Sequence, residues 1–118
     1  MLKIKRITDP TAKTDGVRIL VERIWPRGVQ EEDAQIAEWY QAIAPSDPLR
    51  KWFANKAEKW DEFRKRYTIE LHKEEARKIV DKLRERAKKE TITLIHSGKD
   101  EERNAAAVVR LLLMMKID

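Results

Sequence analysis

The sequence contains no cysteine and only two histidines, His72 and His96. Without cysteine the chain can form no disulfide, no thiolate metal site and no cysteine nucleophile. Two histidines are too few for a histidine-rich metal centre. We therefore expect no metal site, and nothing in the sequence indicates a particular cofactor.

Long apolar runs are absent as well. No stretch approaches the roughly 18 consecutive apolar residues of a membrane-spanning helix. Met1 to Lys5 alternates apolar and charged side chains, whereas a signal peptide has an apolar block near its start. We therefore expect a soluble, cytoplasmic protein without a membrane partner. The length, with no repeat or linker, predicts one domain over residues 1–118.

Charges of both signs are abundant. The chain has 26 Lys and Arg against 21 Asp and Glu, so its net charge is only +5. An excess of this size attracts polyanions weakly. Dense mixed charge without cysteine is typical of thermophilic proteins, in which ion-pair networks cost less to desolvate at high temperature. A well-solvated surface explains the same composition, because surface ion pairs contribute little.

Three segments have the pattern of β-strands. Leu2 to Ile7 alternates apolar and charged residues, as an edge or near-edge strand does. Residues 17–24 are β-branched and apolar on both faces, which predicts a central strand that ends at Trp25-Pro26-Arg27-Gly28. Thr91 to His96 is a shorter run of the same kind. We predict that segments 17–24 and 91–96 are neighbouring parallel strands. The fold class is α/β, with a largely parallel or mixed sheet of about four strands flanked by helices.

Four segments have helical patterns. Ser46 has the position of an N-cap, with Pro48 in the first turn of a helix. Two apolar stripes follow at helical spacing, Trp60, Phe63, Tyr67 and Leu71, then Ala76, Ile79, Val80, Leu83 and Ala87. Their relative rotation predicts a break near residues 72–74. A last helix is expected from Glu101 to Met115. Residues 36–43 fit helical spacing but can also be interpreted as a strand.

Ligands of open α/β sheets bind outside the carboxyl ends of the strands. This rule selects three loops, and the residues in them that could bind a ligand are Arg23, Trp25, Arg27, Gly28, Ser46, Ser97, Lys99, Asp100 and Asn104. We expect Arg23, Lys99 and Asp100 to converge in one cleft, because ionisable groups beside apolar strands are tolerated together better than singly. The last loop precedes a helix, so its amides and Lys99 could bind a small anion.

Each of these assignments has a structural alternative. Arg23 could pair with Glu22 or Asp100, and Gly28 could only turn the chain. Asp100 could be the N-cap of the last helix. His96 alternates onto the same strand face as Ile92 and Leu94, which favours a packed core residue over a general base. Ser97 has no base and orienting acid at a recognisable spacing. The four tryptophans are expected as core and helix-packing residues rather than as stacking platforms.

Several sequence blocks resemble one family. They are Arg18 to Gly28 with its Trp-Pro-Arg-Gly ending, Ala44-Pro45-Ser46, Leu49 to Phe53, Phe63 to Tyr67, Thr93-Leu94-Ile95, Ser97, Lys99-Asp100, Asn104 and Ala106. In these blocks, which extend over nearly the whole chain, the sequence is similar to the YeaO-like family of small prokaryotic proteins, domain of unknown function 488. The resemblance implies an α/β fold, a shared polar cluster, and a short helix followed by a strand in place of a helix over 36–43. It implies no reaction.

Three functions are consistent with the sequence. The first is a pocket for a small phosphorylated or carboxylated anion, whether or not the protein is an enzyme. The second is a structural or protein-interaction module in which the polar cluster only holds loops together. The third is non-specific nucleic-acid binding through residues such as Lys65 and Arg66, although no nucleic-acid motif is present. The oligomeric state is not indicated.

Overall fold

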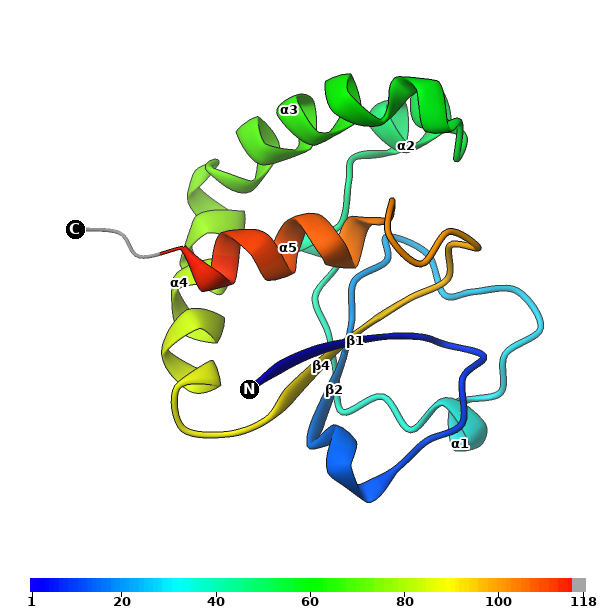
Figure 1. The fold of residues 1–118 in the computed structure, drawn as a ribbon, viewed down its shortest axis with the longest axis vertical. Helices are drawn as coiled ribbons and strands as arrows, with labels where there is room; N and C mark the ends of the chain where they lie inside the picture. Colours follow the sequence, from blue (N-terminus) through cyan, green and yellow to red (C-terminus); the bar gives the residue numbers. More distant parts are fainter. Residues whose placement is uncertain (116–118) are drawn as a thin grey trace.

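The computed structural model describes residues 1–115 and contains a four-stranded, fully parallel sheet. Its strands are β1 (Leu2–Arg6), β2 (Val17–Leu20), β3 (Glu38–Trp39) and β4 (Ile92–His96), in the order β1-β4-β2-β3 (Figure 1). The expected α/β fold is confirmed. Within residues 1–115, no helix is long and apolar enough to cross a membrane.

The two strands expected to be neighbours, β2 and β4, are the central pair. All five residues of β4 are buried, and the pairing runs from Val17 opposite Ile92 to Leu20 opposite Ile95. The predicted parallel pairing is therefore confirmed. Regular pairing of β2 ends at Leu20 rather than at residue 24, although the Val21 N–H still donates to a β4 carbonyl. β1 lies at the sheet edge, as its alternation predicted.

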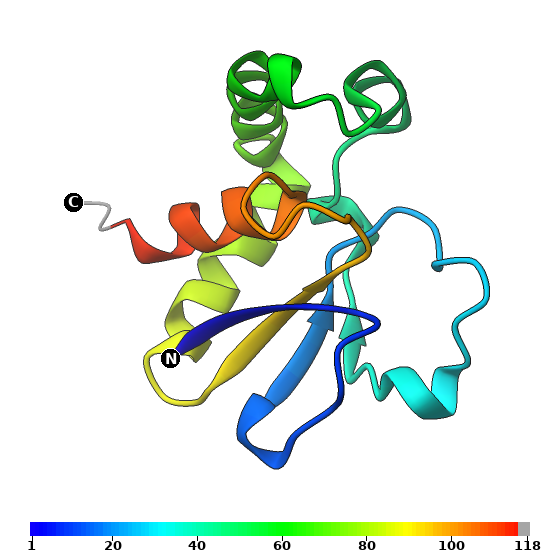
Figure 2. The same ribbon diagram turned by 45° about the vertical axis from the view of Figure 1, so that its right-hand side comes forward.

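Four longer helices pack on one side of the sheet. They are α2 (Asp47–Phe53), α3 (Trp60–Leu71), α4 (Glu74–Ala87) and α5 (Ala105–Met114), and α2 and α3 lie beyond the carboxyl ends of β2 and β4 (Figure 2). Phe63, Tyr67 and Leu71 are buried in the main core, as the stripe predicted. The helix is interrupted between α3 and α4 at the predicted place, because the apolar stripe rotates there.

The ambiguous segment, residues 36–43, does not form the helix that its spacing allowed: it contains β3, followed by a 3-10 turn over Gln41–Ile43. A short helix followed by a strand, as the resemblance implied, is present only if the preceding helix α1 (Glu31–Ala34) is included, because no helix lies between residue 36 and β3. The expectation that the tryptophans are core and helix-packing residues is wrong for Trp39, which is 38% exposed on β3. β3 is an edge strand of two residues, so little of the chain covers this side chain.

The opposite face of the sheet carries a smaller core, and it also contains a buried ion pair that the sequence pattern did not reveal. Arg18 lies on β2 and donates to Asp15 at 2.7 Å, while Lys5 on β1 contacts the same carboxylate at 2.9 Å. Asp15 is 2% exposed and Arg18 is 5% exposed. The face of β2 that carries Arg18 is therefore not wholly apolar, and β2 tolerates the charge because Asp15 compensates it.

Candidate functional site

A pocket of about 340 Å³ lies at the carboxyl ends of β2 and β4, where the sheet meets α2 and α3. Its ionisable walls are Glu22, Arg23, Arg50, Lys51 and His96. Ser97, Asn104 and Asn55 are among its neutral polar residues, and Pro45, Phe53 and Phe63 are among its apolar ones. A volume of this size is at the lower end of the range for small-molecule sites.

Arg23 is fixed by backbone carbonyls rather than by an acid. Its guanidinium donates to the carbonyl of Ala44 at 2.9 Å and to that of Pro45 at 3.4 Å, just before α2 begins. No carboxylate of residues 1–115 lies within 4.0 Å of it, so the alternative, an ion pair with Glu22 or Asp100, does not form. The positive charge of Arg23 is therefore held in place on the pocket wall without a counterion from the described part of the chain.

Glu22 and Ser97 connect the ends of the two central strands. The Ser97 hydroxyl donates to Oε1 of Glu22 at 2.8 Å. Burial raises the pKa of the Glu22 carboxyl above its ordinary value, while hydrogen bonds from Ser97 and the charge of Arg50 act in the opposite direction.

His96 is the last residue of β4, and it is a packed residue as its alternation indicated. It is 2% exposed, and its Nδ1 accepts a hydrogen bond from the Gly98 N–H at 3.1 Å. Burial, with the charge of Arg6, lowers its pKa to about 4. At neutral pH the ring is therefore neutral with its proton on Nε2, and it adds no charge to the pocket.

The loop after β4 differs from its expected form. Asn104, not Asp100, caps α5: its side chain accepts from the Ala107 N–H and donates to the carbonyls of Asp100 and Glu101. The helix therefore begins at residue 105 rather than at residue 101. Asp100 instead accepts two backbone N–H groups within the loop, and these hydrogen bonds hold its pKa below the ordinary value.

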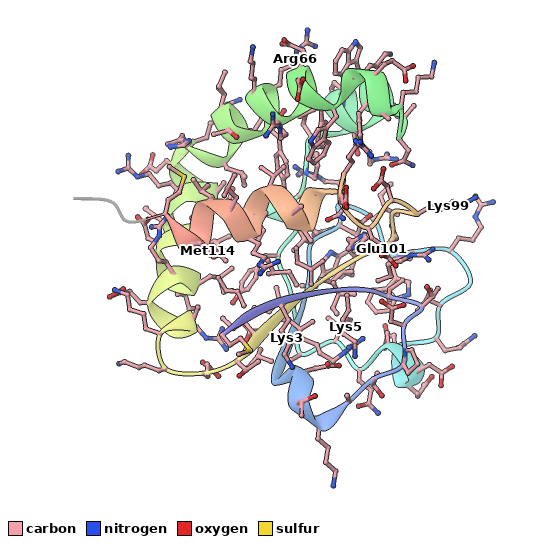
Figure 3. The ribbon with its side chains drawn as sticks, in the orientation of Figure 1. Lys3, Lys5, Arg66, Lys99, Glu101 and Met114 are labelled. Carbon is pink, nitrogen blue, oxygen red and sulfur yellow. The ribbon has the colours of Figure 1, made fainter. Side chains whose placement is uncertain are left out.

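The structure gathers only part of the expected set. Arg23, Ser97 and Asn104 line the pocket, whereas Lys99 and Asp100 are exposed and do not, so Arg23, Lys99 and Asp100 do not converge there. Lys99 projects from the loop at the periphery of the molecule (Figure 3).

The other predicted residues also lie outside the pocket wall. Ser46 caps α2 as expected, and its hydroxyl and N–H donate to Glu70 of α3 at 2.6 and 2.9 Å. Trp25 donates to the Val29 carbonyl and packs on the smaller core. Arg27 and Gly28 are exposed. Gly28 has a positive φ of 80°, and a Cβ added there would meet no atom within 4 Å.

Sequence reasoning missed three charged wall residues, Glu22, Arg50 and Lys51. Glu22 precedes Arg23 directly and could have been selected by the same strand-end rule. Arg50 and Lys51 lie inside α2, and no local pattern distinguishes them from a solvated helix surface. Their place in the pocket depends on how α2 crosses the strand ends.

Comparisons with known proteins agree on one family. The model of the inactive DUF488-N3 subclade matches residues 1–118. The chain is 39% identical over 110 residues to the uncharacterized protein YeaO of Escherichia coli (strain K12), covering 92% of both chains. It is 34% identical over 112 residues to the uncharacterized protein Rv3073c of Mycobacterium tuberculosis, covering 95% of this chain and 92% of the other. No solved structure matches it with significance. With this family match over its whole length and close similarity to YeaO, the chain belongs to the YeaO-like proteins of the DUF488 family.

Proposed function

We propose that this protein binds a small anion, phosphorylated or carboxylated, in the pocket at the carboxyl ends of β2 and β4. The observation that carries the proposal is Arg23. Its guanidinium is held by two backbone carbonyls, faces the pocket, and has no carboxylate partner within residues 1–115. A partly buried guanidinium without a counterion favours an anionic ligand that can supply one.

The balance of charge on the pocket wall supports the same ligand class. Arg23, Arg50 and Lys51 contribute three positive charges, whereas Glu22 is the one acid that lines the pocket among the described residues. Arg50 has a carboxylate partner, Asp47, at 3.3 Å, but both side chains are largely exposed, so that pair is weak. A concave surface with excess positive charge raises the local concentration of anions.

A binding role without turnover also fits the description of the subclade as inactive. His96 is neutral, and its Nδ1 is already occupied by the Gly98 N–H. These properties suit a residue that shapes the pocket better than one that shuttles protons at neutral pH.

The proposal is tested by the melting temperature of the purified protein in millimolar phosphate or sulfate, compared with sodium chloride at equal ionic strength. We expect both oxyanions to stabilise the wild type, because a ligand that binds only the folded state raises its stability by about 1.4 kcal/mol at ten times its Kd. Arg23→Gln should abolish this stabilisation. Arg50→Gln, at an exposed position on the rim, should weaken it without disturbing the fold.

Arg110→Gln is the matched control, because Arg110 is an exposed arginine of α5 outside the pocket. It should respond to phosphate as the wild type does. If neither oxyanion stabilises the wild type, or if the Arg23 and Arg50 variants respond normally, the pocket is not an anion site. The polar residues then act only as structural connections between loops.

A further inference from the structure

Among the residues that the structure describes, the acid in this pocket has no cationic partner. No Lys or Arg nitrogen of residues 1–115 lies within 4.0 Å of the Glu22 carboxylate, although Arg23, Arg50 and Lys51 line the same cavity. Its hydrogen bonds come from Ser97, and the side-chain bond occupies Oε1. An ionised carboxyl has about four acceptor positions, so Glu22 retains acceptor capacity that the protein leaves unused.

Burial makes this arrangement costly unless something compensates it. The pKa of Glu22 is raised, chiefly by desolvation, so the ionised form is not fully stabilised by its surroundings. The backbone of Glu22 is held separately, because its carbonyl accepts a hydrogen bond from the Trp39 indole. The Glu22 side chain is therefore not required for that contact. If the pocket needed only positive charge, a neutral residue in place of Glu22 would make the protein more stable.

We propose that the ligand carries a hydrogen-bond donor, an ammonium or hydroxyl group, beside its anionic group, and that Glu22 accepts this donor while Arg23 binds the anion. This inference rests on the proposed function. It makes the pocket bipolar: the arginine side selects the phosphate or carboxylate, and Glu22 selects among anions by what is attached to them. A plain anion meets the repulsion of Glu22 without any compensating bond.

The test uses three probes with one skeleton, ethyl phosphate, 2-hydroxyethyl phosphate and 2-aminoethyl phosphate, titrated calorimetrically into the full chain. The wild type should bind the hydroxyl and amino compounds at least tenfold more tightly than ethyl phosphate, since a hydrogen bond to a charged group is worth about that much. 2-Aminoethyl phosphate carries less net negative charge than ethyl phosphate. Non-specific attraction to the positive pocket alone would therefore make ethyl phosphate the tighter ligand of these two.

Glu22→Gln should abolish the preference for the amino compound and bind ethyl phosphate several-fold more tightly than the wild type does, because the repulsive charge is gone. Glutamine can still accept the Ser97 hydroxyl. Glu101→Gln is the matched control, since Glu101 is an exposed acid on the loop beyond Ser97 and outside the pocket (Figure 3). It should keep the wild-type preference.

Ser97→Ala provides an independent reading if Glu22→Gln does not fold. Without the serine hydroxyl, Glu22 depends more on the hydrogen-bond donor of the ligand. The ratio of affinities for the hydroxyl and amino compounds over ethyl phosphate should therefore increase. Equal binding of all three probes by the wild type, or a preference unchanged in Glu22→Gln, overturns this inference while the anion site itself stands. Failure of every probe and of inorganic phosphate to bind the wild type overturns the proposed function as well.

Discussion

Removal of the Asp15 charge should strongly destabilise the protein. The carboxylate accepts hydrogen bonds from Lys5 at 2.9 Å, Arg18 at 2.7 Å and the Ala12 N–H at 3.0 Å, and both members of the Asp15–Arg18 pair are buried. Nη2 of Arg18 already lacks a partner in the described residues. Breaking a buried pair from one side costs about 3–5 kcal/mol, because the other charge is left uncompensated.

Asp15→Asn keeps one carbonyl oxygen as an acceptor. We therefore expect it to lower the unfolding free energy, measured by urea denaturation, by about 3 kcal/mol, the lower end of this range. Asp47→Asn removes the same charge from the exposed Asp47–Arg50 pair and should cost less than about 1 kcal/mol. A second substitution, Arg18→Met, should restore much of the stability lost in Asp15→Asn, because it removes the unpaired charge. A cost of Asp15→Asn as small as that of Asp47→Asn would refute this reasoning.

Three further predictions follow from buried or constrained groups. The pKa of His96, lowered by burial to about 4, makes the folded state bind fewer protons than the unfolded state below pH 6.5, so stability should fall by about 3 kcal/mol from pH 6.5 to pH 4. Urea titrations at several pH values check this, and His96→Gln should remove the fall. Phe63→Ala should lower the unfolding free energy by about 3–5 kcal/mol, because the Phe63 ring is 2% exposed and stacks on the Phe53 ring with centroids 4.2 Å apart. A loss below about 1 kcal/mol contradicts that packing. Gly16→Ala should cost more than about 2 kcal/mol, since Gly16 has a φ of 65° and a Cβ would lie 2.2 Å from the Thr91 carbonyl oxygen, whereas Gly28→Ala, with open space, should cost only about 1 kcal/mol.

The acid limb of the stability curve separates Asp15 from His96. Burial raises the pKa of Asp15, but hydrogen bonds from Lys5, Ala12 and Arg18 outweigh it, and the net pKa lies below 3.8. A depressed folded-state pKa contributes stability that is present above pH 3.8 and is lost as pH falls through the folded value. The Asp15 contribution is therefore lost at lower pH than the His96 effect, and Asp15→Asn should remove only the lower part of the curve.

Local patterns were sufficient for the main elements of the fold. The β-branched runs predicted β2 and β4 and their parallel pairing, and the rotated stripe predicted the break between α3 and α4. These features depend on burial periodicity, which is a property of the sequence itself. Burial periodicity could not identify β3, because a strand of two residues is too short to show a period.

Features that depend on distant contacts could be predicted only in part. Asp100 and Asn104 are both good capping residues, and the choice of Asn104 depends on how α5 packs on the sheet. The strand-end rule located the pocket and Arg23, but the positions of Arg50 and Lys51 depend on the path of α2. Arg18 was interpreted as part of an apolar strand, because its partner Asp15 lies outside that strand.

The central claim, an anion site at the carboxyl ends of β2 and β4, is tested most directly by an amide NMR titration with inorganic phosphate. We expect saturable shifts that are largest at the amides of Arg23, Ser97 and Gly98, and that disappear in Arg23→Gln. Shifts that are absent from these amides, or that are spread over exposed lysines such as Lys65 and do not saturate, would contradict it.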